Sequence, residues 1–237
     1  MKCTLDWAHI LGAGCACWVA CACHDVDVRW FPEEGYTFSQ ADIAEVTRIA
    51  EDSVQEARKL LPGLPERIVL EVRDGTRVIP ETGENGTTRP PDAVCWTIDP
   101  SHPDGTSEII RKWLRGTLFH ELHHLVRDKR VHRTTLMDSV ITEGMASAFE
   151  RDAAGLDVPW ARYSKEVEAW VEEVRALPPD TPRRDWLFRH PDGRRWVGYK
   201  VGTYLVDRAM RATGRSAAEL VTEPTKDIVR WASGGRR

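Results

Sequence analysis

Apolar residues recur every three or four positions in several long stretches of the chain. Between Ser39 and Leu61 they form a continuous stripe, which predicts an amphipathic helix that Ser39 caps and Pro62-Gly63 ends. The same spacing predicts four further helical regions: residues 106–127, 137–154, 160–177 and the stretch that follows Trp196. Thr106 or Ser107 is expected to cap the first of these four.

Two short stretches rich in β-branched residues predict strands. They are Arg67–Arg73 and Ala93–Ile98. Residues 80–92 contain several prolines and glycines and are expected to form a loop, as are residues 99–105 and 178–191. The resulting order, a helix, then strands, then helices, indicates an α+β domain with segregated elements.

The overall charge argues against a polyanionic partner. The 237 residues carry a net charge of −4, so neither nucleic acid nor an anionic membrane surface is expected to bind the chain. Basic residues do gather in one stretch, which we interpret as a solvated loop: Arg183, Arg184, Arg189, Arg194 and Arg195.

The first 23 residues differ in composition from the rest. An apolar stretch too short to span a bilayer holds four of the six cysteines, Cys15, Cys17, Cys21 and Cys23. Three interpretations stay open: an export or lipid-anchor segment, a mistaken upstream start, or a cysteine metal or redox site. The first favours the cell envelope over the cytoplasm, with membrane contact only through a lipid anchor.

Residues 24–237 are expected to form one domain. This part of the chain contains a single cysteine, Cys95, so a disulfide framework is excluded as the source of its stability.

The stretch LRGTLFHELHHLVRD, residues 114–128, holds three histidines and one glutamate within five positions. On a helix His120 and His124 lie about 40° apart on one face, with the apolar residues on the opposite side. Two imidazoles one turn apart can supply two corners of a tetrahedral zinc site. Glu121 lies beside the pair, where it can reach a metal-bound water as a general base. The alternative is a solvated helix face.

The next predicted helix offers a third ligand. Glu143 lies 19 positions after His124, on the side of its helix opposite the apolar stripe. The small neighbours Gly144, Ala146 and Ser147 permit a close approach between helices. A hydrolytic zinc site commonly has three protein ligands and an open position, which Glu143 would complete. The alternative is an exposed acid.

These motifs resemble those of known zinc enzymes. HELHH followed by TEGMASAFE is similar to the gluzincins, zinc metallopeptidases with an HExxH helix and a downstream glutamate ligand. The resemblance is closer to a bacterial family of predicted zinc-dependent proteases (YjaZ-like), catalogued as a domain of unknown function. The GYxxG segment of that family appears here as residues 198–202, and the resemblance covers about residues 100–210.

The resemblance implies a zincin-like fold, with a small mixed sheet, an active-site helix and a helical C-terminal part. It implies one Zn²⁺ per chain, with His120, His124 and Glu143 as ligands and Glu121 as base. The chain departs from thermolysin-like enzymes at Ser147, where those enzymes have an aspartate that orients a zinc histidine. The candidates to orient the histidine in this chain are Asp138, Ser147 and Glu150.

An oxyanion-stabilising donor is also expected near the metal. Tyr199 is the preferred candidate, although it could equally pack on a helix made close-fitting by its two glycines. The other candidates lie in loop-like segments: His102, His132 and His190. His123 flanks the ligand pair, either as a supporting group or alternate ligand, or as a solvent-facing or capping imidazole.

The resemblance also implies an edge strand that pairs with the substrate backbone. Ala93–Ile98 or Arg67–Arg73 could serve in this way, or could be ordinary buried strands. Trp96 or Trp113 could line the cleft, although tryptophan more often belongs to a core.

The hypothesis from the sequence is zinc-dependent hydrolysis of a peptide or protein substrate, with a zinc-bound water activated by Glu121. One alternative is a non-proteolytic protein that keeps zinc for stability or partner binding. Another is a metal hydrolase that acts on a non-peptide bond. The oligomeric state is left open.

Overall fold

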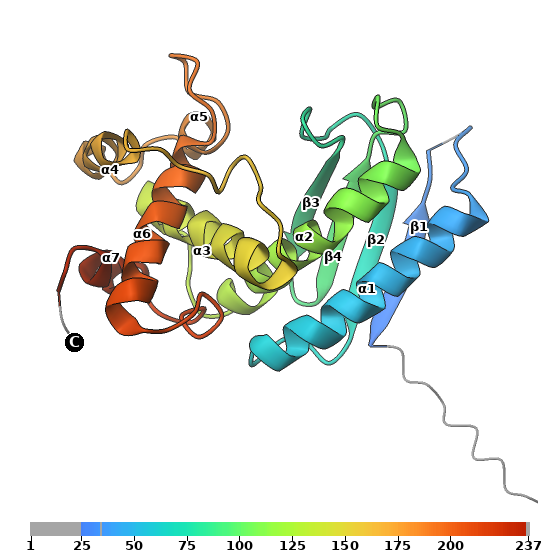
Figure 1. Cartoon of the computed structure of the whole chain (residues 1–237), viewed down its shortest axis with the longest axis horizontal. Coiled ribbons are helices and arrows are strands. Elements are labelled where there is room, and N and C mark those ends of the chain that lie inside the picture. Colours follow the sequence, from blue (N-terminus) through green and yellow to red (C-terminus); the bar gives the residue numbers. More distant parts are fainter. Residues whose placement is uncertain (1–24, 34, 236–237) are drawn as a thin grey trace, which may run out of the picture.

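The computed structural model describes residues 25–33 and 35–235. The predicted signal-like or misassigned segment, residues 1–23, lies outside this range. The described part is an α+β protein, as predicted, with a four-stranded sheet beside a group of helices (Figure 1). The strands are β1 (Val26–Phe31), β2 (Ile68–Asp74), β3 (Glu84–Arg89) and β4 (Ala93–Ile98). The helices are α1 (Gln40–Leu60), α2 (Thr106–Arg127), α3 (Leu136–Ala154), α4 (Val167–Ala176), α5 (Arg183–Leu187), α6 (Val197–Thr213) and α7 (Thr225–Ala232).

The sheet has the strand order β1-β2-β4-β3. Strands β1, β2 and β4 run parallel, whereas β3 is antiparallel to β4 and lies at the edge. Both predicted strands are therefore inner strands. The prediction of a loop over residues 80–92 was wrong, because β3 forms within it. Its sequence ENGTTR has no apolar alternation, and its pairing is determined by β4 and by contacts with α2.

Three further predictions, of one helix, one loop and one helix cap, also need correction. Of the predicted helix 160–177 only Val167–Ala176 is helical, because Trp160 and Ala161 pack with Trp196 in a separate small cluster. The predicted loop 178–191 contains the short helix α5. Helix α2 begins after Gly105 without a side-chain cap, since Ser107 hydrogen-bonds to Asp42 instead. By contrast, Ser39 caps α1 as predicted.

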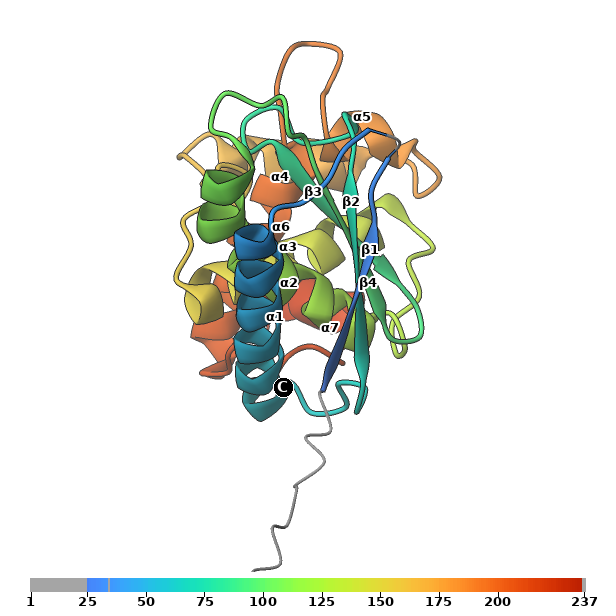
Figure 2. The ribbon, with the colours of Figure 1, turned by 90° about the vertical axis from the view of Figure 1, so that its right-hand side faces the viewer.

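Helices α1 and α2 lie along one side of the sheet (Figure 2). The N-terminal part of α2 packs on α1 and the sheet, and α2 also contacts α3. Helix α3 in turn packs closely against α6. Helix α2 thus connects the sheet with the C-terminal helices, and its last two turns are buried all round. Among the described residues, none of the helices combines the length and the apolar character needed to cross a bilayer.

Candidate metal centre

The HELHH turn of α2 is buried. Its two predicted ligands, His120 and His124, are 8% and 4% exposed, and Glu143 on α3 is 6% exposed. These values contradict two of the alternatives, a solvated helix face at residues 120–124 and an exposed acid at residue 143. His123 is fully buried too, so it is not the solvent-facing imidazole that one alternative assumed.

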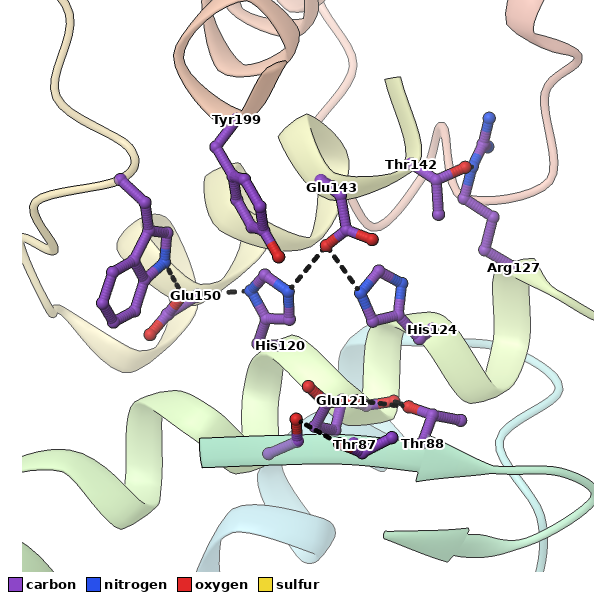
Figure 3. Close-up of polar contacts among 12 residues, drawn as sticks. Thr87, Thr88, His120, Glu121, His124, Arg127, Thr142, Glu143, Glu150 and Tyr199 are labelled. Atoms are coloured by element: carbon purple, nitrogen blue, oxygen red, sulfur yellow. Dashed lines mark hydrogen bonds and ion pairs between the residues drawn. The ribbon is translucent and has the colours of Figure 1, made fainter. Parts of the chain in front are cut away.

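The three predicted ligands converge (Figure 3). His120 Nε2 and His124 Nε2 lie 3.4 and 3.3 Å from Glu143 Oε2, and one donor atom from each residue lies within 4.8 Å of the others. A tetrahedral Zn²⁺ with bonds of about 2.0–2.1 Å separates neighbouring ligand atoms by roughly 3.3–3.4 Å. The donor set, two imidazoles and one carboxylate, and its spacing therefore fit a single zinc ion.

A second carboxylate orients His120. Glu150 Oε2 lies 3.1 Å from His120 Nδ1 and also accepts a hydrogen bond of 3.2 Å from Trp160 Nε1. With a metal ion bound, Glu150 would hold the proton of His120 on Nδ1 and leave the lone pair of Nε2 for the ion. Of the three candidates for this supporting contact, Glu150 makes it. Asp138 instead closes the capping box at the start of α3, and Ser147 Oγ is buried with no hydrogen-bond partner among the described residues.

Arg133 supports the site from the loop between α2 and α3. Its guanidinium donates to Glu143 Oε1 at 2.6 Å and to Asp128 Oδ2 at 2.8 Å, and it lies 3.2 Å from His124 Nδ1. One oxygen of Glu143 is thereby held while the other faces the histidines. Arg133 was not predicted from the sequence, because no helical period fixes the direction of a loop side chain.

The local electrostatics favour a cation between these groups. Burial acts to lower the pKa of His120, but its contacts with Glu143 and Glu150 raise that pKa to about 10. Burial acts to raise the pKa of the Glu143 carboxyl. The facing histidines and Arg133 outweigh this effect and hold that pKa well below its usual range. The Glu143 carboxylate thus remains ionised and attracts positive charge, which a divalent ion also supplies.

Glu121 lies on the side of α2 that faces the edge strand (Figure 3). Thr88 on β3 donates a 2.6 Å hydrogen bond to Glu121 Oε2. The strand approaches closely here because residue 86 is glycine: a Cβ at this position would lie 2.4 Å from Thr117 Cγ2 and 3.0 Å from Glu121 Oε1. Glu121 Oε2 therefore accepts a hydrogen bond from the strand, and Oε1 lies in the space left by the missing side chain of Gly86.

A cavity of about 510 Å³ opens beside this arrangement. His120 and Glu121 line it, and so does Tyr199, whose ring stacks on His120 with the centroids 6.2 Å apart. Burial, together with the nearby charges of Glu143 and Glu121, raises the pKa of the Tyr199 phenol well above its usual value. The phenol accordingly keeps its proton at neutral pH and can donate a hydrogen bond.

Other candidates lie away from the cavity. None of the three loop histidines His102, His132 and His190 lines it. Trp96 is fully buried in the core and Trp113 packs against it, while the tryptophans that do line the cavity are Trp160 and Trp196. No pattern in the sequence indicated these two, because their place depends on how the later loops fold back.

Comparisons with known proteins bear on the family. Searches of curated proteins and of solved structures found no match. A family model described as "Predicted Zn-dependent protease (DUF2268)" matches residues 46–230, from within α1 to within α7. The match covers most of the chain, and the protein therefore belongs to this family of predicted zinc-dependent proteases.

Proposed function

We propose that the protein is a zinc metallopeptidase of the gluzincin type, which holds one Zn²⁺ with His120, His124 and Glu143. The observation that carries the proposal is the convergence of these three donor atoms at the separations that a tetrahedral ion requires, next to a cavity. The family description agrees with zinc-dependent proteolysis.

Each residue of the site has a separate role in the proposed hydrolysis. Bound zinc would supply Lewis-acid polarisation and would lower the pKa of water. Glu121, with Oε1 free beside Gly86, takes a proton from the attacking water and returns it to the leaving amine. The Tyr199 phenol donates a hydrogen bond to the oxygen on which negative charge develops.

Strand β3 is the proposed docking site for substrate backbone. It is the antiparallel edge of the sheet, and its residues Glu84, Asn85 and Gly86 line the cavity. The Glu84 carbonyl already accepts a hydrogen bond from the backbone N–H of Ile79, so the edge offered to a substrate begins after Glu84. An extended peptide can pair with an unpaired strand edge through its main chain. From the sequence, two strands were candidates for this role, with ordinary buried strands as the alternative. Both are inner strands, β2 and β4, whose edges are already occupied. An edge strand beside an HExxH helix is the arrangement expected of a zincin-like fold.

The edge strand and the base favour peptide hydrolysis over the alternatives. A zinc site kept only for stability needs neither Glu121 nor the Thr88 contact that orients it. A small non-peptide substrate has no extended main chain to pair with an open strand edge.

The test is Glu121→Gln. This variant keeps the side-chain shape and is expected to bind zinc as the wild type does, while the turnover of a peptide library falls by roughly 10²–10⁴-fold. Zinc content by elemental analysis and product formation by mass spectrometry give the two readouts. Retained turnover would remove Glu121 from the mechanism. A zinc-loaded wild type that cleaves none of the library would refute the peptidase proposal.

A further inference from the structure

The mouth of the cavity carries arginines from three separate segments. Arg77 follows β2, Arg184 lies in α5 and Arg195 lies two positions before α6, and all three line the cavity. Two of them come from the basic stretch that was interpreted from the sequence as a solvated loop. The structure divides that stretch: Arg194 is bound by Glu173 and Asp192, whereas Arg184 and Arg195 face the cavity.

Within the described part of the chain, two of these three arginines have no charged partner. Arg195 forms an ion pair with Glu81 and lies over the Trp196 ring, 5.0 Å from its centroid. The side chains of Arg77 and Arg184 are exposed and have no hydrogen bond or ion pair with any residue that the structure describes. Their positive charge is therefore available to a ligand.

The acidic residues that line the cavity do not neutralise the charges of Arg77 and Arg184. Glu84, Glu121 and Glu150 are buried, and each accepts hydrogen bonds inside the protein, from Trp96, Thr88 and Trp160 among others. Burial also raises the pKa of Glu84 to about 7, so much of its charge is absent at neutral pH. Positive charge is thus displayed at the exposed rim, and negative charge is held in the interior.

We infer that the cavity selects peptides that carry a carboxylate close to the scissile bond, bound by Arg77 and Arg184. A guanidinium binds a carboxylate through two parallel hydrogen bonds, which makes arginine well suited to this contact. The carboxylate can belong to an Asp or Glu side chain or to the C-terminus of a short peptide. The inference builds on the proposed peptidase function and names its substrate class.

The test is a binding experiment on the zinc-loaded full chain carrying Glu121→Gln, which prevents turnover. Three fluorescein-labelled libraries of hexapeptides are compared by fluorescence anisotropy. The first has Asp or Glu at one fixed position and an amidated C-terminus. The second has Asn or Gln there and is also amidated. The third is the second library with a free C-terminal carboxylate, which separates the two sources of the charge.

The acidic library, the free-carboxylate library or both are expected to bind at least about threefold more tightly than the neutral amidated one, with a loss of selectivity at high salt. Replacing Arg77 and Arg184 together with alanine should abolish the difference. Arg189→Ala is the matched control, because Arg189 lies in the same basic stretch, is exposed and does not line the cavity. Its selectivity should equal that of the parent.

Equal binding of all three libraries, binding of none, or equal effects of the double variant and Arg189→Ala would overturn the inference. Wild-type turnover of the same libraries tests the peptidase function separately. Cleavage without acid preference would leave the function standing and remove the inference. Selective binding without any cleavage would support the carboxylate site and refute the peptidase.

Discussion

At the scale of single residues, the orientation of Glu121 depends on one hydroxyl group. Thr88 Oγ1 donates to Glu121 Oε2 at 2.6 Å and lies 3.0 Å from the Glu121 carbonyl oxygen. The proposed base is therefore positioned by the same strand that we propose binds the substrate backbone. In the proposed mechanism, Thr88 is a positioning residue and Glu121 is the residue that exchanges the proton.

Thr88→Val tests this arrangement. Valine keeps the branched shape but lacks the donor, and a hydrogen bond to a charged group contributes about 1.5–3 kcal/mol. We expect kcat to fall roughly tenfold or more, with KM and zinc content close to wild type. Thr88→Ser, which restores the hydroxyl, should recover most of the rate. Steady-state kinetics on a cleaved peptide provide the measurement. An unchanged kcat in the valine variant, or no recovery with serine, would contradict the assignment.

The site could be predicted where helical geometry fixes direction. His120 and His124 share a face because they are one turn apart, and Glu150 follows Glu143 by seven residues, two turns of the same helix. Arg133 and Thr88 could not be predicted in this way. The first lies in a loop, and the second in a strand that has no apolar pattern.

At the scale of elements, the contact between α3 and α6 depends on two glycines. A Cβ on Gly202 would lie 2.0 Å from the carbonyl oxygen of Val140, and one on Gly144 would lie 2.1 Å from the Gly202 backbone. From the sequence, the small residues around Glu143 were expected to allow a close approach to the helix that carries His120 and His124. In the structure, Gly144 makes its close contact with Gly202 of α6. Glu143, the proposed ligand, and Tyr199 are held near each other by this contact.

Gly202→Ala is expected to lower the free energy of unfolding by about 1–3 kcal/mol, because the added Cβ clashes with backbone that cannot move freely. Gly198→Ala is the control. Its Cβ would meet the end of the Leu187 side chain at 2.6 Å, which can shift, and its nearest backbone neighbour, the Trp186 carbonyl oxygen, would lie 3.2 Å away, against 2.0 Å at Gly202. Alanine also favours the helix over glycine. Urea unfolding of both variants checks the prediction. A Gly202→Ala protein as stable as Gly198→Ala would show that the helices can separate without cost.

Edge strand β3 is joined to its neighbours by a buried carboxyl group. Glu84 Oε2 accepts hydrogen bonds of 2.8 Å from Trp96 Nε1 and from Thr117 Oγ1. Burial raises the pKa of Glu84 from its usual 4.5 to about 7. Between these values the folded protein keeps a proton that the unfolded chain releases. The free energy of unfolding contributed by this group therefore falls as pH rises through this range.

Glu84→Gln should remove this dependence. The amide keeps the shape and can still accept from Trp96 and Thr117, but it does not titrate. Relative to wild type, the variant should gain roughly 2–3 kcal/mol in stability between pH 5 and pH 8, since one pKa unit corresponds to about 1.4 kcal/mol. Urea unfolding at both pH values in the presence of a chelator measures the difference. A stability gap independent of pH would contradict the account of Glu84.

At the scale of the whole molecule, the candidate metal centre lies where the sheet part meets the C-terminal helices (Figure 1). The proposed ligands come from α2, which packs on the sheet, and from α3, which packs on α6. The α+β class could be predicted from the order of periodic segments. The strand order could not, because β1 and β3 owe their places to pairing with distant strands and not to local pattern.

The central claim is a single zinc ion held by His120, His124 and Glu143, and elemental analysis of zinc per chain tests it most directly. Wild type, His120→Ala and the control His132→Ala, an exposed histidine outside the site, are purified from metal-replete medium and compared. We expect one zinc per chain in wild type and in His132→Ala, and none in His120→Ala. Zinc absent from the wild type, or present equally in all three proteins, would contradict it.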